Sequence, residues 1–169
     1  CGGAAPPSEP MHSAGRTTEI HPGDGGSPHV MTEWVIDEAN ISITYGRPYL
    51  KDRVIGETVD PMVGQVWRLG ADEATTLETD ADLMLSDTPI AAGEYTLFVL
   101  TTEDVWQLIV NNQTDQWGLS YDESQDLARI DMDLKVLPQP VDQLLIAVEG
   151  GRLKVDWGTA SASVPLTVQ

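Results

Sequence analysis

Several short segments of this chain place apolar residues at every second position, and this spacing constrains the fold more than any other feature. Ile41, Ile43 and Tyr45 alternate with polar residues, and the same alternation recurs over residues 106–110 and 130–136. A period of two puts the apolar side chains on one face of a β-strand and the polar ones on the other. Gly, Pro, Asn and Asp separate the segments, as expected for turns. The spacing therefore predicts an all-β protein.

The end of the chain predicts how some strands are connected. Residues 144–148 and 153–157 lie on either side of Gly150 and Gly151, and this arrangement is typical of a tight antiparallel hairpin. Many short strands separated by turns favour a sandwich or a barrel. We predict an antiparallel β-sandwich, jelly-roll-like in connectivity, over residues 34–169.

Length and charge narrow the possible functions. The chain has 169 residues, of which 41% are apolar, so it is long enough for one domain with a buried core. Nine Lys and Arg residues stand against 27 Asp and Glu residues, and the formal net charge is −18. Such a surface repels phosphate backbones, which argues against nucleic-acid binding. No run of about 18 apolar residues is present, so the sequence predicts no membrane-spanning helix.

The first 33 residues differ from the remainder in composition. Cys1 and the Gly/Ala/Pro/Ser residues after it resemble the start of a mature bacterial lipoprotein, in which this cysteine is acylated. The resemblance implies an extracytoplasmic protein anchored to a bilayer through Cys1. Residues 2–33 are rich in Gly and Pro and lack an apolar period, which predicts an extended tether. We expect this tether to be ordered by contact with a membrane-embedded protein complex.

All three histidines fall within the expected tether, and their roles are open. His12, His21 and His29 are accompanied by Met31, and imidazole with thioether is a ligand set that suits copper. Their spacings match no compact metal-binding motif, however. We therefore expect these four residues to contact the partner protein, and we expect neither a metal site nor a cofactor.

Five stretches of the chain carry a resemblance to a known family, and the longest of them contains Val66, Trp67 and Arg68. They are residues 45–48, 64–76, 92–97, 116–118 and 121–122. With these stretches the chain resembles the bacterial family called domain of unknown function 2911. The resemblance implies an exported β-sandwich protein and brings no established activity.

Arginines and carboxylates in and after these stretches form a candidate polar cluster. Its members are Arg47, Arg68, Glu73, Asp122 and Arg129, with Asp126 as a further partner. Carboxylates beside arginine are compatible with a sugar-binding or acid–base site. Arginine–carboxylate pairs also hold loops to the ends of a sandwich, and we favour this structural role.

Nucleophilic and metal-dependent catalysis lack the residues that they need. Residues 34–169 contain no His and no Cys, and no phosphate-binding or calcium-binding loop motif is present. Only a carboxylate-dependent hydrolase is compatible with this composition, and no motif supports it. We therefore expect a protein that is not an enzyme.

An acidic stretch suggests a second kind of partner. Residues 72–87 contain six Asp and Glu residues and neither Lys nor Arg. Such a stretch usually forms a solvated surface, but it can also attract a cationic protein.

Three functional hypotheses follow from these observations. The first is a non-catalytic, lipid-anchored accessory subunit on the periplasmic face of a membrane complex, with respiratory and photosynthetic electron transport as candidate hosts. The second is a free-standing envelope lipoprotein that binds a small ligand, such as a carbohydrate, at the polar cluster. The third is the carboxylate-dependent hydrolase.

Overall fold

The structure is a computed structural model that describes residues 16–21, 28–51, 54–55, 62–70, 75–102, 105–113 and 122–169. Its elements in chain order are β1 (Arg16–His21), β2 (His29–Ile36), β3 (Ala39–Gly46), β4 (Val66–Trp67), β5 (Thr75–Thr79), β6 (Leu83–Leu85), β7 (Thr88–Ile90), β8 (Gly93–Thr101), β9 (Trp106–Asn111), the 3-10 helix η1 (Glu123–Gln125), β10 (Asp126–Glu149) and β11 (Arg152–Val168). Every strand pair is antiparallel. The all-β prediction is therefore confirmed.

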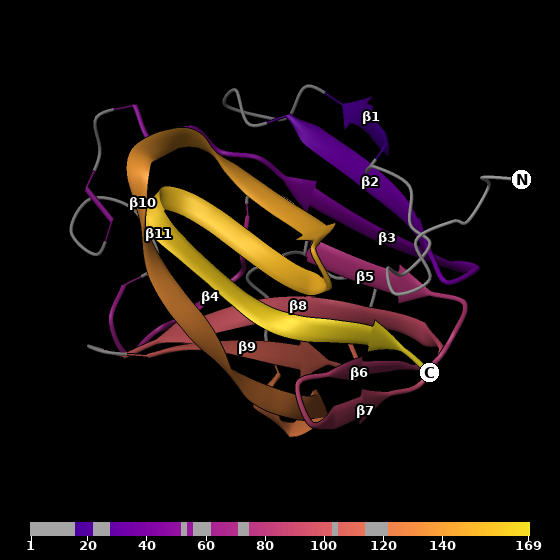
Figure 1. Cartoon of the computed structure of the whole chain (residues 1–169). Coiled ribbons are helices and arrows are strands. Elements are labelled where there is room, and N and C mark those ends of the chain that lie inside the picture. Colours follow the sequence, from indigo (N-terminus) through magenta and orange to yellow (C-terminus); the bar gives the residue numbers. More distant parts are fainter. Residues whose placement is uncertain are drawn as a thin grey trace, which may run out of the picture.

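The strands form one continuous sheet that bends into two layers. Their order is β1-β2-β3-β5-β8-β9-β10-β11-β6-β7, and β4 pairs with β8 beside this path. Figure 1 shows β10 and β11 curving together, so that their central part turns away from β8 and β9 and folds back over the sheet. The bend lets one half of the sheet face the other half, as in a sandwich.

Contacts between the two layers define the core. The Tyr45 hydroxyl on β3 donates a hydrogen bond to the Ile146 carbonyl on β10 and accepts one from the Ile146 amide, at 3.5 and 3.0 Å. Burial raises the pKa of Tyr45, so the phenol remains protonated. Trp157 on β11 stacks on Trp67 of β4, with ring centroids 6.4 Å apart. Trp67 also meets Trp106 of β9 edge to face, which joins three strands through indole rings.

The expected division between tether and sandwich falls inside a strand. Sequence analysis ends the tether at residue 33, but β2 runs from His29 to Ile36 and crosses that position. β2 pairs with β3 over its whole length, and β1 pairs with β2 in turn. Residues 16–21 and 29–33 therefore belong to the protein's own sheet. The short β1 segment lacks an apolar period because its described side chains are exposed on an edge strand.

The hairpin predicted at Gly150 and Gly151 is confirmed, and the strands on both sides are longer than expected. Both glycines have left-handed backbone angles, with φ of 60° and 72°, which a tight turn between twisted strands requires. β10 continues through Pro138 and Pro140, and the pairing with β11 changes register between Val136 and Leu145. The prolines therefore lie where the ladder is irregular, which is how a strand accommodates them.

We expect Trp157→Ala to lower the free energy of unfolding by about 3–5 kcal/mol, because it leaves a cavity between the layers. The Trp157 side chain is fully buried, with 0% of its surface exposed. Val136→Ala serves as the control, because Val136 is 83% exposed and its truncation should change stability by less than about 0.5 kcal/mol. Denaturant unfolding of both variants measures the difference. Equal losses would contradict the two-layer core.

Candidate functional site

A groove lies on the outer face of the N-terminal half of the sheet. Its volume is about 840 Å³, within the range of ligand-binding clefts. Side chains from β1, β2, β3, β5 and β8 line it, together with the turn residue Asp80. The buried residues of these strands alternate with the groove residues, so the core on one face positions the groove on the other.

The strand registers align one row of side chains across the floor of the groove. Arg16 lies opposite Glu33, Glu33 opposite Ser42, Ser42 opposite Glu78, and Glu78 opposite Glu94. Directly opposed residues in antiparallel strands have Cβ atoms about 4.5–5.5 Å apart. The row therefore brings three carboxylates and one guanidinium, from four strands, into one line.

The carboxylates in the groove differ in their surroundings. Asp80 accepts hydrogen bonds from the Asn40 side chain and backbone amide, at 2.7 and 2.8 Å, and these bonds lower the pKa of Asp80. Within the described part of the chain, no hydrogen bond or ion pair involves the side chains of Glu33, Glu78 or Glu94. Asp80 thus ties β5 to β3, whereas the other three carboxylates are available to a ligand.

Two of the groove carboxylates lie in the acidic stretch that the sequence indicates, and two lie outside it. Glu78 and Asp80 belong to the acidic stretch over residues 72–87, for which a cationic partner was one interpretation. Glu33 fell within the expected tether, and Glu94 stands in a short Gly-Glu-Tyr segment with no acidic neighbour. Glu33 and Glu94 lie near Glu78 only because β2, β3, β5 and β8 pair in this order, and no local sequence pattern predicts that pairing.

The described members of the predicted polar cluster each have hydrogen-bond partners within the chain. Arg47 donates from Nε to the carbonyl of Leu144 at 2.8 Å, which ties the end of β3 to β10. Arg68 donates from Nε to the carbonyl of Gly70 at 3.2 Å, so this bond stays within the segment that follows β4. Glu73 lies outside the described residues. Arg47 and Arg68 thus stabilise backbone segments, as in the structural interpretation of the cluster.

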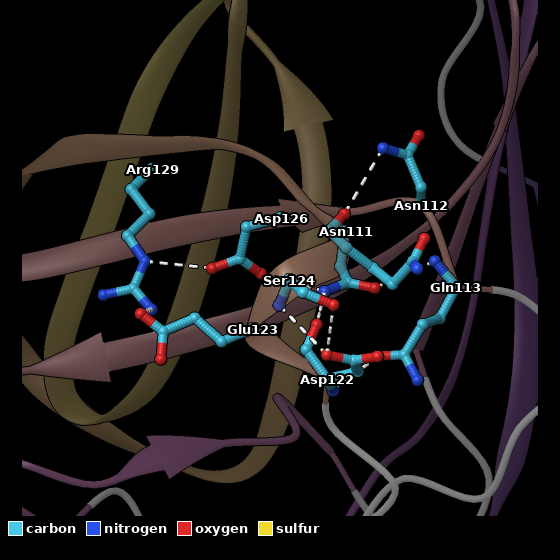
Figure 2. A network of polar contacts seen from close by, with 9 residues as sticks. Asn111, Asn112, Gln113, Asp122, Glu123, Ser124, Asp126 and Arg129 are labelled. Carbon is cyan, nitrogen blue, oxygen red and sulfur yellow. Dashed lines mark hydrogen bonds and ion pairs between the residues drawn. The ribbon is translucent and has the colours of Figure 1, made fainter.

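Asp122 and Arg129 do share a network, where β9 ends and β10 begins (Figure 2). Arg129 donates from Nε to Asp126 at 3.1 Å and forms an ion pair with Glu123 at 3.4 Å. Asp122 caps η1 by accepting a hydrogen bond from the Ser124 amide at 3.0 Å. These pairs are formed within one connection and hold it against the sheet.

Asn111 is the centre of this network, and sequence analysis did not single it out. It is fully buried, and its amide donates to the Asp122 carbonyl and to the Asp126 carboxylate, at 3.0 and 2.8 Å. Its side-chain oxygen accepts from the Gln113 amide at 2.8 Å. Because both the amide and the oxygen of the Asn111 side chain have partners inside the protein, Asn111 holds the connection between β9 and β10 in place.

The residues expected to contact a partner are only partly described. Cys1 and His12 lie outside the described residues. β1 ends at His21, and β2 begins at His29, whose side chain is only 4% exposed. Met31 is half-buried on β2 and lines the groove.

The described side chains include no set of three His, Cys, Asp or Glu residues close enough to hold a metal ion. No helix within the described ranges has the length and apolar character needed to cross a membrane. An acidic, partly apolar groove of this kind can bind a cation or a cationic chain.

Comparison with known proteins identifies a family. A family model described as a protein of unknown function, DUF2911, matches residues 27–166. The chain belongs to this family. No curated protein and no solved structure matches it. The match begins before His29, so the DUF2911 domain includes β2, in agreement with the strand pairing and not with a boundary at residue 33.

We expect Asn111→Asp to lower the free energy of unfolding by about 2–4 kcal/mol at neutral pH, because a buried carboxylate oxygen would replace the amide donor and face Asp126 and the Asp122 carbonyl. The introduced carboxyl should have a raised pKa in the folded protein, so part of the loss should be recovered as the pH falls. Asn112→Asp is the matched control on an exposed neighbour and should cost less than about 0.5 kcal/mol. Unfolding measured at several pH values tests both; a loss in Asn111→Asp that did not vary with pH would contradict this explanation.

Proposed function

We propose that this protein is a non-catalytic, lipid-anchored docking subunit of the extracytoplasmic envelope, which binds a cationic segment of a membrane protein complex in the groove. The observation that carries the proposal is the row of Glu33, Glu78 and Glu94 across the floor of the groove. These carboxylates have no described partner within the chain, so a ligand with Lys or Arg side chains would supply one.

The shape and composition of the groove support a polypeptide segment as the ligand. Apolar Met31 and Val35 accompany the carboxylates, and they can contact the aliphatic parts of Lys or Arg side chains. The net charge of −18 attracts a basic partner over a distance and favours rapid association at low ionic strength. A second copy of this chain would be repelled by the same charge.

The proposal keeps the accessory-subunit hypothesis and changes its contact surface. Sequence analysis assigned the contact to residues 2–33, but residues 16–21 and 29–33 are paired within the sheet. We therefore assign the contact to the outer face of β2, β3, β5 and β8. Cys1 is still proposed to carry the lipid.

Binding of a small ligand at the arginine cluster is the weaker alternative. Arg47 and Arg68 each donate to a backbone carbonyl, and Arg129 is held by Asp126 and Glu123. A ligand anion would have to compete with these bonds. The groove imposes no such competition, because its free carboxylates lie on an open face.

The double variant Glu78→Gln/Glu94→Gln should bind a short oligolysine peptide about tenfold more weakly than the unaltered protein, since two exposed ion pairs contribute about 0.2–1 kcal/mol each and desolvation in a groove adds to this. Fluorescence anisotropy of a labelled peptide measures the affinity. Raising the ionic strength from about 50 to 200 mM should reduce the difference, because salt screens exposed charges.

The matched control is Asp87→Asn/Asp131→Asn. Both carboxylates are exposed and lie outside the groove, and Asp131→Asn keeps the oxygen that accepts from Gln107. The two double variants change the formal charge equally, from −18 to −16. The control should bind within about twofold of the unaltered protein. Equal weakening in both variants would show that net charge alone attracts the peptide and would reject the groove.

A further inference from the structure

The three carboxylates of the row on the groove floor lie on different strands and not along one strand. Glu33 is on β2, Glu78 on β5 and Glu94 on β8, and β3 lies between β2 and β5. Figure 1 shows these strands side by side, so the row runs across their direction. A ligand that lies along the strands passes over one carboxylate of the row. A ligand that meets all three has to cross the strands.

The strand spacing sets the intervals along the row. Neighbouring strands lie about 4.8 Å apart, so Glu78 and Glu94 are separated by about 4.8 Å across the sheet, and Glu33 and Glu78 by about 9.6 Å. The basic side chains of a ligand have to match these two intervals on one face.

An α-helix matches both intervals. With a rise of about 1.5 Å per residue, positions i and i+4 lie about 6 Å apart along the helix axis, and positions i+4 and i+11 about 10.5 Å apart. At about 100° per residue, the three positions lie within about 40° of one another around the axis. An extended chain advances about 3.3 Å per residue, so three residues cover the longer interval, but an odd number puts the two side chains on opposite faces.

The floor of the groove is the face of a paired sheet, and this also favours a helix. The backbone groups of β2, β3, β5 and β8 bond within their ladders. An extended peptide lying on this face would find no partners there for its own N–H and C=O groups, whereas a helix satisfies these groups internally. The groove therefore has to supply only side-chain contacts to a helix.

Apolar side chains lie on both sides of the row at its β2 end. Met31 and Val35 are each two residues from Glu33 on the same face of β2, about 6.7 Å away along the strand. Val35 is 43% exposed, so its side chain is accessible to a ligand. A helix with its side chains is about 10–12 Å in diameter, so residues that flank a basic side chain over Glu33 would contact both apolar groups.

Arg16 gives the row a direction. It lies opposite Glu33 on β1, at the other end of the row from Glu94. A helix carries partial positive charge at its N-terminus and partial negative charge at its C-terminus. The charges of the row therefore favour a helix with its N-terminus over Glu94 and its C-terminus beside Arg16. An acidic side chain about one turn after i+11 would pair with Arg16.

We propose that the cationic segment bound in the groove is an amphipathic basic α-helix that lies across β8, β5, β3 and β2. Its Lys or Arg residues at i, i+4 and i+11 meet Glu94, Glu78 and Glu33. This inference rests on the proposed function, because it specifies the form of the segment that the groove binds. Helix-in-groove docking is a common form of peptide recognition, and here the anchoring side chains are basic.

Peptides that differ only in the spacing of their lysines test the helix. The first has Lys at i, i+4 and i+11 in a sequence of Ala and Gln that ends with Glu at i+15. The second has the same composition with Lys at i, i+5 and i+10, which point to different sides of a helix. We expect the full-length protein to bind the first peptide about tenfold more tightly, because the second cannot form all three ion pairs at once. Fluorescence anisotropy measures the affinities.

Two further measurements report the helix itself. A peptide of this length is only marginally helical in water, so circular dichroism should show that the first peptide gains helix when it binds. Replacing one of its central Ala residues by Pro should remove its advantage over the second peptide, because Pro interrupts the helix without changing the charge.

Arg16→Gln tests the direction of the helix. It should weaken binding of the first peptide about threefold, and the loss should disappear with a peptide that carries Gln in place of Glu at i+15. Equal losses with both peptides would overturn the assigned direction.

The outcomes separate this inference from the proposed function. Equal affinities for the two lysine spacings, together with weaker binding of both peptides by Glu78→Gln/Glu94→Gln, would overturn the helix and leave the groove as the binding site. Equal affinities of Glu78→Gln/Glu94→Gln and the unaltered protein for every peptide would reject the groove and the helix together.

Discussion

The uninterrupted pairing of β2 with β3 is the constraint on which the proposed binding groove depends. Eight opposed pairs, from His29 with Gly46 to Ile36 with Ala39, fix which side chains face the core. Because strand side chains alternate with a period of two, a slip of one residue would expose Trp34 and bury Glu33. The burial of Trp34 and Ile36 therefore fixes the position of the acidic row, and the same register places His29 and Met31 on the groove face.

Local patterns predicted the strands and one turn, but they could not predict how distant strands meet. Alternation identified β3, β9 and β11, and Gly150 with Gly151 identified the hairpin. Alternation shows residues 130–136 and 144–148 as separate segments, yet β10 runs through both and through Pro138 and Pro140, where the β10–β11 ladder shifts register. The groove could not be predicted from local patterns. Its acidic row depends on β2, β3, β5 and β8 being neighbours in the sheet, and the sequence of the connecting loops does not indicate that order.

The arginines of the predicted polar cluster have structural roles in the described part of the chain. The Arg47 guanidinium bonds the Leu144 carbonyl, at the point where β3 passes β10 across the layers. A buried carbonyl without a donor costs about 1–3 kcal/mol, so an arginine that supplies one stabilises the fold as much as a core side chain does. Arg129 acts similarly at the start of β10 through Asp126 and Glu123. A charged residue in a sequence motif is therefore a poor indicator of a binding site until its hydrogen-bond and ion-pair partners within the chain are known.

The acidic row lowers the stability of the sheet that carries it. Glu78 lies directly opposite Glu94, and like charges in opposed positions are destabilising, by up to about 1 kcal/mol. A neutral pair at the same positions would remove this repulsion without disturbing the core, because both side chains are exposed. Asp80 differs from these two glutamates, because the backbone and side-chain amides of Asn40 donate hydrogen bonds to its carboxylate. Violations of local stability rules tend to occur where a surface has a second role, and a cationic partner would convert this repulsion into attraction.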